Sequence, residues 1–96
     1  MSPINKNKLN LLRVKLDKLD NELLKLIKKR SKFVNEVLKV KTHKHEIIDQ
    51  KRINFILKKI KIKSVQLKID PKITNRIWKN MIWSFIDYEK RNFKKK

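Results

Sequence analysis

The chain contains no glycine and no cysteine, and its 96 residues include only two prolines, Pro3 and Pro71. Without glycine, Asn, Asp or Lys must occupy the positions of tight turns that need a positive φ angle. We therefore expect neither β-hairpins nor the glycine-rich loops that bind phosphates. A dinucleotide-binding fold is excluded on the same ground. The absence of cysteine excludes disulfides, thiolate nucleophiles and cysteine-based metal sites, and it fits a cytoplasmic location.

Long apolar stretches are also missing from the sequence. Residues 1–8 are polar and lack the apolar centre of a signal peptide. No run of apolar residues reaches the length of a membrane span. We therefore expect a soluble, cytoplasmic protein with no membrane partner.

Acidic residues are scarce, with 9 Asp and Glu against 28 Lys and Arg, which gives a formal net charge of +19. Such a balance is typical of proteins that bind nucleic acid or an anionic surface. Here, however, the basic residues are spread along the whole chain rather than gathered in one block. We interpret most of them as solvated surface and expect no specific nucleic-acid partner. The non-enzymatic alternative is a basic helical dimer that binds nucleic acid or an acidic partner.

The first part of the chain has the pattern of one long helix, predicted over residues 6–41. Its apolar residues recur at alternating spacings of three and four, as in a heptad seam. They are Leu9, Leu12, Leu16, Leu19, Leu23, Leu26, Phe33, Val37 and Val40. Such a helix is about 54 Å long, whereas a compact chain of this size has a radius of gyration of only ~12 Å. The seam therefore needs a second chain, and the pattern predicts a homodimer.

Two shorter helices are predicted after this one. Residues 42–48 are expected to form a loop, after which Asp49 is suited to cap the second helix. Residues 61–68 alternate polar and apolar side chains; we interpret them as a fraying helix end and a connector, with a short strand as the alternative. Asp70 followed by Pro71 is a strong start signal for the third helix.

The predicted fold class is all-α, with one very long N-terminal helix and two shorter ones. We divide the chain into an N-terminal extension (residues 1–8), a helical domain (residues 9–90) and a frayed basic tail (residues 91–96). His43 and His45 lie two residues apart in the predicted loop without an evident third ligand, so no metal site is expected.

One position of the heptad seam is charged. Arg30 interrupts the run of apolar residues, and a lone charge inside a helix interface costs several kcal/mol unless an anion pairs with it. The partner is either an acidic residue of a second chain or the carboxylate of a ligand. Periodicity alone leaves both interpretations open.

Three further charged residues are candidates for the same site. Arg13 and Lys41 flank the seam about 42 Å apart, so one site cannot take both from the same chain, whereas Arg30 and Lys41 are only about 16 Å apart. In an antiparallel or crossed dimer, Arg13 of the partner subunit would meet Arg30 and Lys41. Glu89 continues the apolar stripe of the third helix and would be a hydrogen-bond donor or proton carrier there. The alternative interpretation is that Arg13, Lys41 and Glu89 are ordinary surface residues whose side chains face water and take no part in a site.

These residues, in this order, resemble the all-helical chorismate mutases over about residues 9–89. The positions that carry the resemblance are Arg13, Arg30, Lys41, Asp49-Gln-Lys-Arg52 and the third helix from Asp70-Pro71 to Glu89. The resemblance implies an intertwined three-helix dimer whose active sites are shared between chains. It also implies the pericyclic rearrangement of chorismate to prephenate in aromatic amino-acid biosynthesis, with no cofactor and no covalent intermediate.

The resemblance assigns a role to each basic residue. Arg30, together with Arg13 of the partner subunit, would clamp the two substrate carboxylates, for which bidentate arginine is well suited. Lys41 would donate to the ether oxygen, where negative charge develops as the C–O bond breaks. Arg52 would support the carboxylate end, and Asp49 would contribute its backbone near the ring hydroxyl.

Three positions depart from the family pattern. Ile53 stands where many members have a Glu that contacts the substrate hydroxyl, and Phe85 stands where a Ser contacts a carboxylate. Glu89 stands where a late Gln donates to the ether oxygen, and a Glu must be protonated to donate. We therefore group Ile53 and Phe85 with the substrate-binding residues, and Glu89 with Lys41 as catalytic.

The same departures also resemble a sister activity. Isochorismate pyruvate-lyases share the fold and the cationic site, and they eliminate pyruvate from isochorismate in salicylate synthesis. Similar features are the lack of Glu after Arg52, the eleven-residue step from Lys41 to Arg52, and the Phe85-Ile86 pair before Glu89. The lyase reaction is therefore the enzymatic alternative to the mutase reaction.

Overall fold

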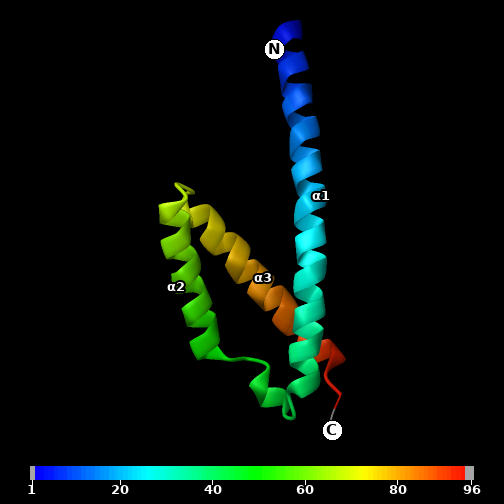
Figure 1. Cartoon of the computed structure of the whole chain (residues 1–96), viewed down its shortest axis with the longest axis vertical. Coiled ribbons are helices and arrows are strands. Elements are labelled where there is room, and N and C mark those ends of the chain that lie inside the picture. Colours follow the sequence, from blue (N-terminus) through cyan, green and yellow to red (C-terminus); the bar gives the residue numbers. More distant parts are fainter. Residues whose placement is uncertain (1, 95–96) are drawn as a thin grey trace. The chain divides into compact units, whose positions relative to one another are not determined.

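The computed structural model describes residues 2–94, which form three long helices and one short 3-10 turn (Figure 1). These elements are α1 (Pro3–Val40), η1 (Lys44–Glu46), α2 (Gln50–Gln66) and α3 (Pro71–Asn92). No strand occurs among the described residues. The predicted all-α fold with one very long first helix is confirmed.

Helix α1 begins at Pro3, three residues earlier than the heptad pattern predicted. The side-chain oxygen of Ser2 accepts a hydrogen bond of 3.2 Å from the backbone N–H of Asn5 and so caps the first turn. Proline fits the first helical position because it has no N–H to leave unpaired. Most of the segment predicted as an N-terminal extension is therefore helical.

The apolar seam of α1 is exposed. No residue of this 38-residue helix is buried, and Leu16, Leu19 and Leu23 keep between 54% and 60% of their surface accessible. The chain divides into two compact units, Met1–Phe33 and Val34–Lys96, whose boundary falls inside α1. The N-terminal unit is thus a stretch of helix that carries unburied leucines along its length.

Within the C-terminal unit, α2 and α3 form a helical hairpin (Figure 1). The turn between them places Lys68 at a φ of 60°, so a lysine takes the left-handed position that glycine usually fills. The backbone N–H of Ile69 then donates to the carbonyl of Ser64 at 2.8 Å. Because α2 is helical to Gln66, the strand considered for residues 61–68 is wrong.

The start of α3 is as predicted. Asp70 is the N-cap and accepts a 2.9 Å hydrogen bond from the backbone N–H of Lys72, with Pro71 at the first helical position. The helix continues to Asn92, so the first residues of the predicted frayed tail are ordered as helix. Residues 95 and 96 of that tail lie outside the described residues.

A small core holds the C-terminal unit together. Its buried members are all isoleucines, namely Ile47, Ile53, Ile82 and Ile86. Beside this cluster, the buried hydroxyls of Ser64 and Thr74 lie 2.7 Å apart and share a hydrogen bond between α2 and α3. Among residues 2–94, no helix is both long enough and apolar enough to cross a bilayer.

Candidate active site

An ion pair joins the end of α1 to the last part of α3. Lys41, the first residue after α1, donates through Nζ to Oε2 of Glu89 at 3.0 Å. The pair is shielded from water, because the two side chains keep only 16% and 8% of their surface accessible. The structure therefore brings together the two residues predicted to be catalytic, which lie 48 positions apart in the sequence.

The lysine of this buried charge pair can still donate hydrogen bonds to a ligand. Taking two charges out of water is costly, and their mutual attraction offsets that cost only when the geometry is good. The lysine ammonium has three N–H donors, and Glu89 takes one of them. Lys41 can thus keep its partner and still donate to a negatively charged or polarised oxygen of a ligand.

The residue before Glu89 ties α3 to α1 a second time. The hydroxyl of Tyr88 donates to Oδ1 of Asn35 at 2.8 Å, and both residues are half-buried. Two neighbouring positions on α3 therefore contact the C-terminal end of α1. This second contact restrains the turn of α3 that carries Glu89.

The loop between α1 and α2 is organised by Glu46. Its carboxylate accepts hydrogen bonds from the hydroxyl and the backbone N–H of Thr42 and from the backbone N–H of His43. The hydroxyl of Thr42, followed by the backbone N–H of His43, holds the pKa of the Glu46 carboxyl below its ordinary value of 4.5. Glu46 is therefore ionised in this loop at neutral pH.

The loop is expected to loosen in acid. Because folding lowers the pKa of Glu46, its stabilising contribution is complete above the unfolded value of 4.5 and is lost as the pH falls through the lower folded value. Nuclear magnetic resonance of the Thr42 and His43 backbone amides across this range checks the prediction. The Glu46→Gln variant should lack the transition, and an identical transition in that variant would assign it to another group.

Asp49 and Arg52 occupy the first turn of α2. Asp49 is the N-cap, and its Oδ1 accepts a 3.0 Å hydrogen bond from the backbone N–H of Arg52. The guanidinium of Arg52 lies 5.4 Å from the ring centre of Phe55 and is exposed. Lys41 and Asp49 line one shallow, open depression together with Glu46, Ile48, Gln50 and Lys51.

Ile53 and Phe85, two of the three departures from the family pattern, are placed differently. Ile53 is buried, and its side chain belongs to the isoleucine core together with Ile47 of the loop. Phe85 is half-buried on α3, about one helical turn before Glu89. Ile53 thus packs inside the C-terminal unit, whereas Phe85 lies on the same helix as the catalytic candidate.

Arg13 and Arg30 belong to the N-terminal unit. Both lie on α1; Arg13 is exposed and Arg30 is half-buried. The structure thus groups Lys41, Glu89 and Asp49 in the C-terminal unit, and it carries the two arginines on the other unit.

Sequence reasoning missed Glu46. Its only signal is the spacing His43-x-x-Glu46, in which an acidic side chain reaches back three residues to a backbone N–H as in a capping box. The contact between Asn35 and Tyr88 had no sequence signal, because it joins elements that are distant along the chain.

A sequence model of the chorismate mutase type II family matches residues 12–90. The chain belongs to this family. The match covers every position named above as a candidate, from Arg13 to Glu89. Searches of curated proteins and of solved structures found no significant match. Membership of the chorismate mutase family makes the chain an enzyme of the chorismate mutase type, in the isomerase class.

Proposed function

We propose that the chain rearranges chorismate to prephenate. The observation that carries the proposal is the buried pair of Lys41 and Glu89 in a chain of the chorismate mutase type II family. In this reaction the C–O bond of the ether breaks as a C–C bond forms, and negative charge gathers on the ether oxygen. A fixed ammonium whose side chain is itself largely buried stabilises that charge in the transition state.

The remaining roles follow from what a unimolecular rearrangement needs. The substrate must be held in a compact conformer, which is a matter of positioning rather than of acid–base or nucleophilic chemistry. We assign that positioning to Arg30 and to Arg13 of the partner subunit, each bound to a substrate carboxylate. We assign supporting roles to Asp49, which lines the same depression as Lys41, and to Arg52 in the first turn of α2. No cofactor is required for this chemistry.

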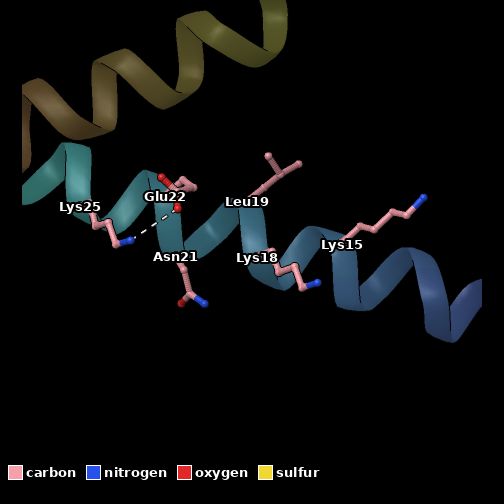
Figure 2. A pocket seen from close by; sticks show the side chains of 6 residues that line it. All are labelled: Lys15, Lys18, Leu19, Asn21, Glu22 and Lys25. Carbon is pink, nitrogen blue, oxygen red and sulfur yellow. Dashed lines mark hydrogen bonds and ion pairs between the residues drawn. The ribbon is translucent and has the colours of Figure 1, made fainter.

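We propose that the enzyme is a homodimer joined through α1. Exposed leucines recur along this helix at heptad spacing, and the groove that contains Leu19 is lined by side chains of α1 alone (Figure 2). The ion pair of Lys25 with Glu22 beside it is exposed and spans 3.5 Å, so it adds little stability. A second copy of α1 would bury the leucines and bring Arg13 to the partner's Lys41.

The lyase reaction on isochorismate is the second candidate. The observation in its favour is that position 53 is an isoleucine, which has no carboxylate, and that its side chain is buried in the core rather than exposed to a substrate. The two activities share the same need for cations around a dicarboxylate. They differ in the substrate and in whether pyruvate is released.

The deciding experiment is an ultraviolet assay of the purified protein with chorismate and, in parallel, with isochorismate. Loss of chorismate with appearance of prephenate supports the mutase, whereas pyruvate and salicylate from isochorismate alone make the lyase primary. Turnover that Arg30→Ala abolishes while the dimer persists supports an enzyme with a carboxylate clamp. No turnover of either substrate, with duplex binding that weakens steeply as salt rises, would favour the nucleic-acid-binding alternative.

We predict that Glu89→Gln keeps its activity, because the amide oxygen can accept from Lys41 and the amide N–H can donate to the ether oxygen. Steady-state rates with chorismate check this. A large loss of kcat in this variant would show that the site needs the carboxylate of Glu89 rather than a hydrogen-bond donor.

A further inference from the structure

The loop that follows Lys41 is built around one carboxylate oxygen. Oε1 of Glu46 accepts from the backbone N–H of Thr42 at 3.3 Å, from its hydroxyl at 2.9 Å and from the backbone N–H of His43 at 2.9 Å. The ring nitrogen Nδ1 of His43 lies 3.2 Å from the same oxygen. Two consecutive backbone N–H groups that converge on one anion form a nest, which fixes the local backbone.

These hydrogen bonds determine the direction in which Lys41 leaves the backbone. On its N-terminal side, the N–H of Lys41 donates to the carbonyl of Leu38 at 3.3 Å. On its C-terminal side, the N–H of Thr42 belongs to the peptide unit that begins at Lys41, and it donates to Glu46. Each peptide unit is planar, so holding both units sets the φ and ψ angles of Lys41 and the direction of its Cα–Cβ bond.

Glu46 is itself anchored to the core. Its backbone N–H donates to the carbonyl of His43 at 3.1 Å, and the next N–H, of Ile47, donates to the carbonyl of Lys44 at 3.2 Å. The side chain of Ile47 is only 3% exposed and belongs to the isoleucine cluster. The core thus restrains Glu46, and Glu46 restrains the backbone of Lys41.

We propose that Glu46 is a positioning residue for Lys41, which aims the lysine ammonium at Glu89 and at the reacting oxygen of the substrate. The inference rests on the proposed function for its second part. Glu46 lines the same depression as Lys41, but its role does not require contact with the substrate. Its low pKa agrees with this role, because the donors that lower it are groups of Thr42 and His43.

The test is a double-mutant cycle on kcat with Glu46→Ala, Lys41→Met and the two combined. Misplacing a catalytic group by about 1 Å can cost roughly a hundredfold, so Glu46→Ala alone should lower kcat about 10- to 100-fold with little change in KM. In the Lys41→Met background the same change should have less than about a twofold effect, because its target is gone. Glu46→Gln keeps an acceptor oxygen and should restore most of the rate.

The matched control removes a carboxylate that has a surface partner. Asp87 pairs with Arg91 at 2.9 Å and its side chain is 68% exposed, so Asp87→Ala should leave kcat unchanged. An equal loss of kcat from Glu46→Ala in both backgrounds would overturn the proposal, as would full activity of Glu46→Ala. If Glu46→Ala does not fold, the same cycle is measured with Glu46→Gln. The small loss of kcat expected of Glu46→Gln should then appear only when Lys41 is present.

A second readout separates this inference from the proposed function. Reductive methylation with carbon-13 gives each lysine a resonance, and the Lys41→Arg variant identifies that of Lys41. Glu46→Ala should shift this resonance, whereas Asp87→Ala should not. If the unmodified protein turns over neither substrate, the proposed function fails, and the resonance alone decides the positioning role. An unchanged Lys41 resonance in Glu46→Ala would overturn that role.

Discussion

Replacing Lys41 with methionine is expected to lower kcat about a thousandfold, with little change in KM. Methionine keeps much of the length of the side chain but has no N–H to donate to the ether oxygen. Removing one donor from a developing oxyanion costs roughly 10²- to 10³-fold in kcat, and a charged donor is expected at the upper end of that range. Steady-state measurement with chorismate at several pH values gives both constants.

The stability of this variant needs its own control. Lys41→Met leaves Glu89 buried without its cation, and breaking a buried pair in this way costs about 3–5 kcal/mol. The double variant Lys41→Met with Glu89→Gln removes both charges, so it should fold nearly as well as the unmodified protein and remain inactive. Glu89→Gln alone keeps a side-chain oxygen that can accept from Lys41, so it should keep its activity. Activity of the double variant within tenfold of Glu89→Gln would exclude Lys41 as the donor.

Placing glutamates at Leu19 and Leu23 is expected to dissociate the proposed homodimer and abolish activity. Each new carboxylate would lie in the apolar seam without a partner, at a cost of several kcal/mol. Because the proposed site takes Arg13 from the second chain, a monomer has an incomplete site. Sedimentation measurements give the association state, and the chorismate assay at the same protein concentrations gives the activity.

The matched control introduces a glutamate elsewhere on α1. Asn10 is exposed and lies on the opposite side of the helix from Leu19. Asn10→Glu should therefore leave the proposed dimer and its activity intact. A dimer that survives glutamates at Leu19 and Leu23 would show that the chains associate through another surface.

The sequence predicted the helices well because each is marked by local signals. The heptad leucines mark α1, and the two Asp caps mark α2 and α3. The start of α1 was placed late because the cap at Ser2 precedes the first seam residue, Leu9. The strand considered for residues 61–68 was wrong because its alternation came from surface lysines. The buried contact of Ser64 with Thr74, which favours the helix, depends on packing against α3.

The candidate site was predictable in part. The position of Glu89 on the apolar stripe of α3 left open whether its side chain faces the pocket of Lys41 or solvent, and the structure pairs it with Lys41. The burial of Ile53 was not predictable, because an isoleucine in the first turn of a helix suits either a pocket or a core. Its environment is decided by Ile47, which the loop delivers to the same cluster. Glu46 was missed because its hydrogen bonds to Thr42 and His43 exist only once the loop is folded.

The turn at Lys68 shows that the lack of glycine affects stability in two opposite ways, through strain in the folded chain and through the entropy of the unfolded chain. A lysine held at a φ of 60° costs about 1–2 kcal/mol in backbone strain. Elsewhere the lack of glycine restricts the unfolded chain, and at suitable positions a residue other than glycine stabilises a protein by about 0.4–1 kcal/mol through that restriction. The unfolded ensemble of this protein is therefore unusually narrow. Folding therefore costs less conformational entropy, and the small isoleucine core found among the described residues has less to offset.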